Sequence, residues 1–103
     1  MKVSMYAVFD RASAIYDGPF PGQTDGVMVR NFTHTVMNAD SAIAKSPEDF
    51  TLFKVGTWDD AKGELTACVP VKLINGAEAL ASTKRVMKDN EEILNSDRDW
   101  ETK

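Results

Sequence analysis

The chain has 103 residues, of which 43% are hydrophobic and 27% are charged, a composition ordinary for a single globular domain. It carries 12 basic and 16 acidic residues, so any nucleic-acid site must be a local basic and aromatic face on an acidic protein. One cysteine and one histidine exclude an internal disulfide and a zinc site of the Cys/His type, and no apolar run is long enough to cross a bilayer.

Residues 3–9 predict a first β-strand, because successive side chains of a strand point to opposite faces of the sheet. One face then carries Val3, Met5, Ala7 and Phe9, and the other carries Ser4, Tyr6 and Val8. Residues 10–23 predict a loop, since they contain two turn-forming sequences, Asp17-Gly18-Pro19 and Pro21-Gly22.

A helix is predicted to begin at Thr24 or Asp25, because either side chain can accept a hydrogen bond from the free amides of the first turn. It is predicted to run to about Ala44, since Pro47 lacks an amide hydrogen and restricts the residue before it. The predicted buried stripe of this helix comprises Val29, Phe32, Val36, Ala39 and Ile43.

Residues 51–58 and 64–74 predict a β-hairpin, whose connecting segment begins with aspartate and ends with Gly63, as in a bulge-type turn. Pro70 cannot donate a hydrogen bond to a neighbouring strand, so the second strand is predicted to lie at a sheet edge or to end near Val69. Strict alternation over residues 51–58 places Phe53 and Val55 on one face and Leu52, Lys54 and Trp58 on the other.

These elements predict an α+β fold with a core domain of order β-α-β-β over residues 1–74, in which one helix covers one face of a small sheet. A right-handed crossover through the helix would place the first strand parallel to the second or the third.

Residues 75–103 predict a carboxyl-terminal helix, from residue 77 to about residue 95, followed by a polar tail. Apolar pairs recur in it every seven residues, at Ala79-Leu80, Val86-Met87 and Ile93-Leu94. Three interpretations stay open: this seam packs across the chain's own sheet, it pairs with a second copy in a homo-oligomer, or the segment is a frayed, partly disordered tail.

Catalytic residue patterns are weak in this sequence. His34 lies on the polar flank of the first predicted helix, and the acidic pairs Glu48-Asp49 and Asp59-Asp60 occupy turn positions that account for them. We therefore expect a protein that is not an enzyme, holds no metal and uses no cofactor.

Two stretches of the chain carry a family pattern. The first contains Asp10, Ala12, Tyr16, Pro19-Phe20, Asp25-Gly26, Arg30 and Phe32, and the second contains Lys45, Pro47-Glu48-Asp49-Phe50, Leu52-Phe53, Gly56, Asp59-Asp60 and Gly63. In order and spacing over residues 3–66, they resemble the small nonstructural protein of gokushovirus-type microviruses. Ser46, where histidine is common, and Trp58, where a smaller aromatic residue is common, depart from the pattern.

The resemblance implies a phage protein that binds single-stranded DNA during replication or packaging of the genome. It implies a non-catalytic mechanism and a place of action in the infected bacterium. Because no apolar run is long enough to cross a bilayer, we expect no membrane contact and a location in the cytoplasm that makes the protein. The first residues do not follow a signal-peptide pattern, which agrees with that location.

Binding of a single strand requires aromatic rings on which bases stack and nearby cations that contact the phosphates. The candidate stacking rings are Tyr6 and Trp58, and the candidate phosphate contacts are Arg11, Arg30 and Lys54. Phe32, Phe50 and Phe53 are interpreted as core residues.

The net charge of −4 and the seven-residue spacing of the last helix favour a different function. In this alternative, the chain is an acidic protein-interaction or oligomerisation module that regulates phage replication or assembly without contacting DNA.

Overall fold

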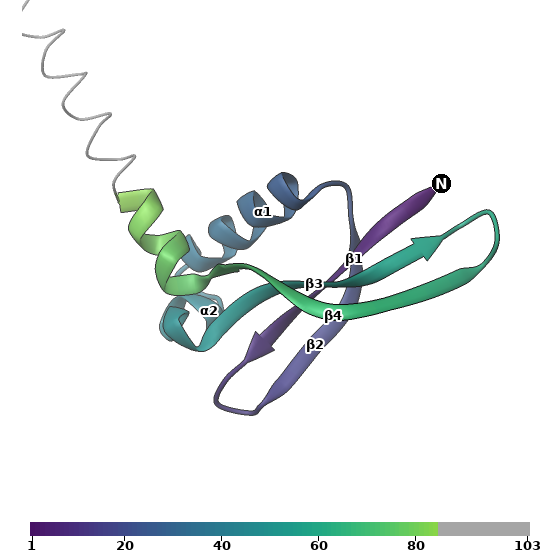
Figure 1. The fold of residues 1–103 in the computed structure, drawn as a ribbon. Coiled ribbons are helices and arrows are strands. Elements are labelled where there is room, and N and C mark those ends of the chain that lie inside the picture. Colours follow the sequence, from purple (N-terminus) through teal and green to yellow (C-terminus); the bar gives the residue numbers. More distant parts are fainter. Residues whose placement is uncertain (85–103) are drawn as a thin grey trace, which may run out of the picture.

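Four antiparallel strands form one sheet in the spatial order β2-β1-β3-β4 (Figure 1). The computed structural model describes residues 1–84. The strands are β1 (Lys2–Asp10), β2 (Ile15–Gly22), β3 (Phe50–Asp59) and β4 (Glu64–Asn75), and the helical elements are α1 (Asp25–Met37), α2 (Ala42–Lys45) and the 3-10 turn η1 (Pro47–Asp49). Residues 76–84 are also helical.

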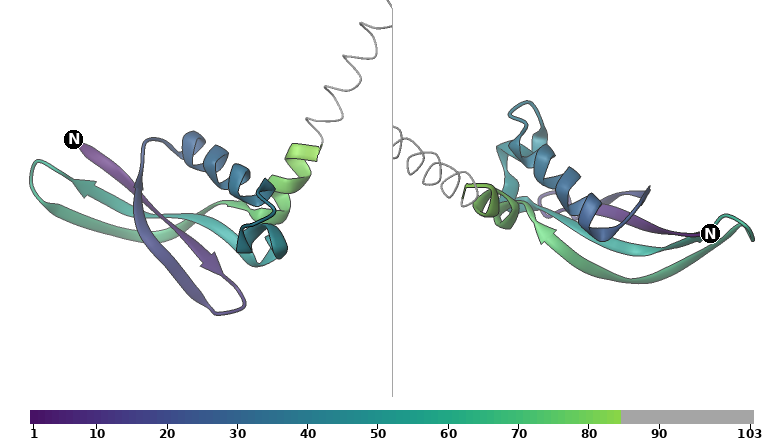
Figure 2. Two further views of the ribbon diagram at one scale, coloured as in Figure 1. Left: turned by 180° about the vertical axis from the view of Figure 1, so that it is seen from behind. Right: turned by 90° about the horizontal axis from the view of Figure 1, so that it is seen from above.

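The core lies between the helices and one face of the sheet. In Figures 1 and 2, α1 lies on one side of the sheet, and no helix of the described residues covers the other side. The buried residues of this core are Tyr6, Phe32, Val36, Leu52 and Ala79, and the partly buried residues packed against them include Val8, Phe20, Met28, Ile43 and Leu80. The other face of the sheet is therefore open to a ligand.

The α+β class, the covering helix and the helix after the last strand are confirmed, but the predicted order lacks a strand. Residues 15–22, predicted as part of a loop, form β2 along the outer edge of β1. Both prolines of this segment are tolerated because an edge strand leaves half of its amides unpaired. The register of the β1–β2 ladder shifts between Tyr6 and Val8, and this irregularity accommodates the turn-forming residues.

The extra strand also reverses the predicted direction of the sheet. β2 returns the chain to the beginning of β1, so α1 and the turns after it bring β3 in at the far end, where Phe50 lies opposite Asp10. β1 is therefore antiparallel to β3, and the predicted parallel pairing is wrong. The two strands that α1 connects, β2 and β3, run in the same direction with β1 between them.

The first helix is shorter than predicted. Thr24 is its N-cap, since the Oγ1 of Thr24 accepts from the amide of Val27 at 3.1 Å. The helix ends at Met37 instead of Ala44, because Asn38 leaves the helical conformation and its Oδ1 accepts from the Asp40 amide at 3.1 Å. A new turn then starts at Ser41, which leaves Ala39 exposed instead of buried.

Two local predictions in the following stretch are confirmed. The helical segment α2 ends at Lys45, and Pro47 opens η1. In the hairpin turn, Gly63 has a φ of 67°, and its amide donates to the Asp59 carbonyl at 2.8 Å. Pro70 lies in β4, which is an edge strand as expected.

The helical segment at residues 76–84 packs on the chain's own core, because Ala79 has 0% exposure among the core residues. The apolar pairs Val86-Met87 and Ile93-Leu94, on which the oligomer interpretation depends, lie outside the described residues. Within residues 1–84, the structure contains no helix long and apolar enough to span a membrane.

Candidate nucleic-acid interface

Three aromatic rings from three adjacent strands meet on the open face of the sheet. The ring centroid of Phe9 on β1 lies 4.6 Å from that of Tyr16 on β2 and 6.4 Å from that of Phe53 on β3. Tyr16 and Phe53 lie 5.4 Å apart in an edge-to-face arrangement. We call Phe9, Tyr16 and Phe53 the aromatic cluster.

Strand register explains why these rings meet. Phe9 lies directly opposite Tyr16 in the β1–β2 ladder, and Phe53 lies opposite Ala7 in the β1–β3 ladder. Opposite residues share a face, and Ala7 and Phe9 share one because they are two residues apart on β1. Ala7 is only 3% exposed although no helix covers it, which fits a small residue lying beneath the neighbouring rings.

Trp58 lies on the same face as the aromatic cluster, farther along the sheet. It pairs with Val3 of β1 on one side and with Leu65 of β4 on the other. The side chain is 38% exposed, and Tyr16 is 44% exposed. The open face thus presents accessible ring surface at two places along its length.

Tyr6, the other predicted stacking ring, lies on the opposite face and is 0% exposed. Its hydroxyl donates a hydrogen bond to Asp25 Oδ1 at 2.7 Å, at the start of α1. Burial and then this hydrogen bond raise the pKa of the Tyr6 hydroxyl above 10.0, because both favour the protonated form. A ring enclosed in the core cannot stack on a base, so Tyr6 is a structural residue and that part of the prediction is wrong.

The raised pKa of Tyr6 predicts a loss of stability at high pH. Above pH 10.0, the unfolded chain releases the Tyr6 proton while the folded protein retains it. The folded state then binds more protons, so the free energy of unfolding falls as the pH rises. We expect Tyr6→Phe to be less stable than wild type at pH 7 by about 1 kcal/mol, and this difference to shrink above pH 10. Urea denaturation at pH 7, 9 and 10.5 measures it, and a constant difference would contradict the assignment.

Lys54 is separated from Trp58 by an irregularity in β3. Met5 pairs with Gly56 and Tyr6 pairs with Lys54, so Val55 is an extra residue that reverses the alternation. Lys54 therefore shares the helix-covered face with Tyr6, and its Nζ lies 3.7 Å from Asp25 Oδ1. The prediction that Lys54 and Trp58 share a face is wrong for this reason.

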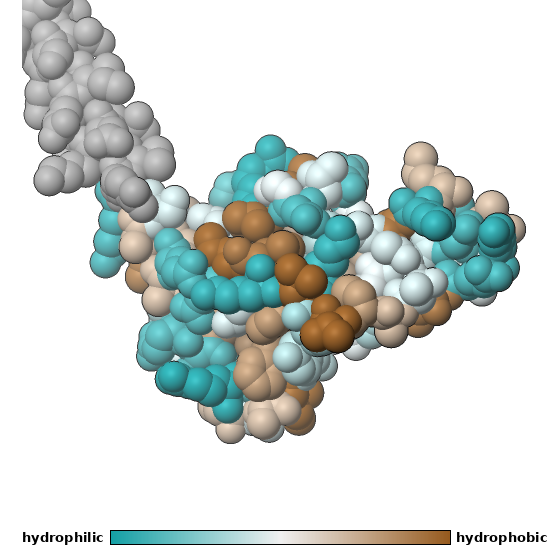
Figure 3. Space-filling model, viewed as in Figure 1, coloured by the Kyte–Doolittle hydropathy of each residue, from teal (hydrophilic) through white to brown (hydrophobic). Residues whose placement is uncertain are grey.

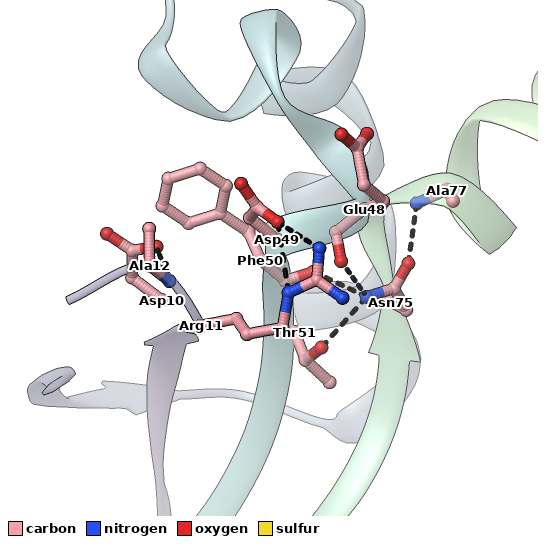
Figure 4. Close-up of polar contacts among 9 residues, drawn as sticks. All are labelled: Asp10, Arg11, Ala12, Glu48, Asp49, Phe50, Thr51, Asn75 and Ala77. Carbon is pink, nitrogen blue, oxygen red and sulfur yellow. Dashed lines mark hydrogen bonds and ion pairs between the residues drawn. The ribbon is translucent and has the colours of Figure 1, made fainter. Parts of the chain in front are cut away.

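The two predicted arginines also lie apart from Trp58. The Arg11 guanidinium donates to Asp49 Oδ1 from Nε at 3.1 Å and from Nη2 at 2.6 Å (Figure 4). Arg30 is an exposed residue of α1, on the other side of the sheet from the aromatic cluster. The five predicted residues therefore do not form one surface, and Trp58 alone is placed on the open face by its ladder position.

The sequence patterns do not reveal the aromatic cluster. They assign Phe53 to the core and Tyr16 to a loop. The available signal is Ile15-Tyr16, two residues that favour strands, directly after the short turn at Ala12-Ser13-Ala14. Recognition of that turn would predict a β1–β2 hairpin and would place Tyr16 near Phe9.

No group of three histidine, cysteine, aspartate or glutamate residues within residues 1–84 is arranged to hold a metal ion.

A protein-family model described as "Phage ORF5 protein" matches residues 3–79, which include β1 from its second residue, the other three strands, α1 and the beginning of the last helical segment. No curated protein and no solved structure matches the chain significantly.

Proposed function

Since this chain belongs to the phage ORF5 protein family, we propose that it serves the phage as a non-catalytic protein that binds single-stranded DNA on the open face of its sheet. The observation that carries the proposal is the aromatic cluster together with Trp58 on a face that no described helix covers. Bases stack on such rings whatever their sequence, because every base has a π-face.

The charge of the protein limits how DNA can be held. With a net charge of −4, little affinity comes from the release of counterions around the phosphates. Stacking must therefore supply most of the binding free energy, and the affinity should depend on salt less steeply than that of a basic protein. Several copies along one strand would strengthen such weak individual contacts.

The proposal also includes a more specific relationship within phage proteins. The resemblance over residues 3–66 supports a relative of the gokushovirus-type nonstructural protein, which acts during replication or packaging of a single-stranded genome. The place of action is then the cytoplasm of the infected bacterium.

Tyr16→Ala is expected to weaken binding of a fluorescein-labelled oligothymidine about tenfold, since one base–aromatic stack contributes roughly 1–3 kcal/mol. Tyr16 is the most informative position because it is exposed and lies on the edge strand β2, where truncation disturbs the core least. Fluorescence anisotropy at low salt measures the dissociation constant, and a thermal melt verifies that the variant is folded.

Met37→Ala is the matched control. Met37 is a large, half-exposed residue at the end of α1, on the covered side of the sheet, so the dissociation constant should stay at the wild-type value. The proposal fails if wild-type protein shows no saturable binding at tens of micromolar, or if the two variants lose affinity equally.

A second function, the acidic interaction module, is favoured by the exposed apolar residues of β4. Val69 is 85% exposed, and Leu65 and Val71 are also exposed on this edge strand. Figure 3 shows apolar surface over the middle of the molecule, where Figure 1 places β4. Exposed apolar surface on a strand edge is typical of protein–protein contacts. Absence of oligothymidine binding, with a mass above one chain by light scattering, would favour this function.

A further inference from the structure

One lysine lies beside the aromatic cluster. Lys72 of β4 is directly opposite Phe53 in the β3–β4 ladder, so the two residues share the open face of the sheet. The sequence patterns single out neither Lys72 nor its place beside Phe53. A lysine on this face can supply the cation that single-strand binding requires next to a stacking ring.

In the free protein this cation already has an anionic partner. The Nζ of Lys72 donates to Oε1 of Glu78 at 2.6 Å, and Glu78 lies in the helical segment at residues 76–84. Both side chains are 55% exposed. An ion pair so exposed contributes little net free energy, because water screens it and two long side chains lose freedom in forming it. Another anion can therefore replace the carboxylate at small cost.

The other two side-chain ion pairs near the sheet, those of Arg11 and Lys54, are less suited to exchange. Arg11 is held by two hydrogen bonds to one carboxylate oxygen of the mostly buried Asp49, and its backbone amide also donates to the Asp49 carbonyl. Lys54 lies on the helix-covered face with Asp25. Among the ion-paired cations on the strands within residues 1–84, Lys72 is the one that lies beside the aromatic cluster, as its position in the β3–β4 ladder shows.

We infer that Lys72 contacts a phosphate of the bound strand, and that Glu78 is the carboxylate that this phosphate displaces. The inference rests on the proposed function. It adds to that function the residue that contacts a phosphate, Lys72, and the internal carboxylate that competes for it, Glu78. The mechanism is exchange of one anion for another on the same ammonium group, with no covalent step. The carboxylate lowers the affinity of the free protein for DNA, since the phosphate must first take its place.

The test is the charge-neutral variant Glu78→Gln, titrated with fluorescein-labelled oligothymidine at several salt concentrations. We expect the dissociation constant to fall about twofold to fivefold, the range set by the loss of an exposed ion pair. The plot of log affinity against log salt should keep its slope in Glu78→Gln, because the same phosphate contact forms in both proteins, and it should flatten by about 0.7 when Lys72 is also removed, the value for one phosphate contact on a single strand.

Glu64→Gln is the matched control, because it changes the net charge by the same amount. Glu64 lies opposite Asp59 at the far end of the β3–β4 ladder and is exposed. Its effect on affinity measures the general charge contribution alone. The double variant Glu78→Gln/Lys72→Ala tests the identity of the contact, since removal of Lys72 should abolish the gain.

The outcomes separate the two claims. A gain specific to Glu78→Gln that disappears in the double variant supports the inference. Binding by wild type with equal effects of Glu78→Gln and Glu64→Gln, or with a gain that survives loss of Lys72, overturns the inference and leaves the proposed function standing. If neither wild type nor Glu78→Gln shows saturable binding, the proposed function itself is contradicted.

Discussion

Gly76→Ala is expected to lower the free energy of unfolding by about 3 kcal/mol, the upper part of the range for overpacking a buried site. A Cβ atom at this position would lie 2.2 Å from the carbonyl oxygen of Pro47, 2.8 Å from its carbonyl carbon and 3.0 Å from its Cα. All three are backbone atoms of η1, so no side-chain rotation can relieve the contact. Urea denaturation followed by circular dichroism measures the loss.

Gly26→Ala is the control for this effect. Gly26 is near the start of α1 as Gly76 is near the start of the last helical segment, but the atom nearest to a Cβ at residue 26 would be Thr24 Oγ1, at 4.0 Å. Alanine there should leave stability unchanged or raise it by up to about 1 kcal/mol, because alanine favours helix more than glycine does. Equal stability of the two variants would show that the approach of Gly76 to Pro47 is not required.

Asn75→Ala is expected to lower the free energy of unfolding by about 2–4 kcal/mol, because this one side chain hydrogen-bonds to several backbone groups. The Nδ2 of Asn75 lies 3.1 Å from the carbonyl oxygens of Glu48 and Phe50 and 3.0 Å from Thr51 Oγ1. Its Oδ1 accepts from the Ala77 amide at 2.8 Å and so caps the helical segment (Figure 4). Asn75 thus joins the end of β4, the start of β3 and the last helical segment.

Two further substitutions separate these contributions. Asn75→Asp retains an acceptor for the Ala77 amide but directs a carboxylate at two carbonyl oxygens, so it should be at least as destabilising as alanine. Asn31→Ala, at an exposed position of α1, should change stability by no more than about 0.5 kcal/mol. Chemical denaturation of the three variants decides the matter: wild-type stability in Asn75→Asp would mean that the helix cap alone is important.

Local chemistry could be predicted from the sequence, and long-range pairing could not. The N-cap at Thr24, the stop before Pro47 and the turn at Gly63 each depend on a few neighbouring residues, and all three are confirmed. β2 cannot be predicted in this way, because Gly18 and two prolines are turn signals in isolation and form an edge strand only through pairing with β1.

The candidate site depends on pairing even more strongly. The extra residue Val55 moves Lys54 away from the face of Trp58, and the local signal of this bulge is the neighbouring Gly56, an isolated glycine within a strand pattern. Likewise, the sequence alone does not indicate which face of the sheet α1 covers, and therefore does not indicate whether Tyr6 is buried or exposed. Alternation is a reliable guide to faces only while the register is unbroken.

The partnership between β1 and β3 has a consequence for synthesis of the chain on the ribosome. Phe50 lies opposite Asp10 and Asp59 lies opposite Lys2, so β1 gains its second neighbour only when between fifty and sixty residues have emerged. Before then, the β1–β2 hairpin can form but is only marginally stable as an isolated two-stranded unit. Phe9 and Tyr16 therefore leave the ribosome well ahead of Phe53, and nascent chains made side by side on one messenger have time to pair wrongly through the vacant edge of β1.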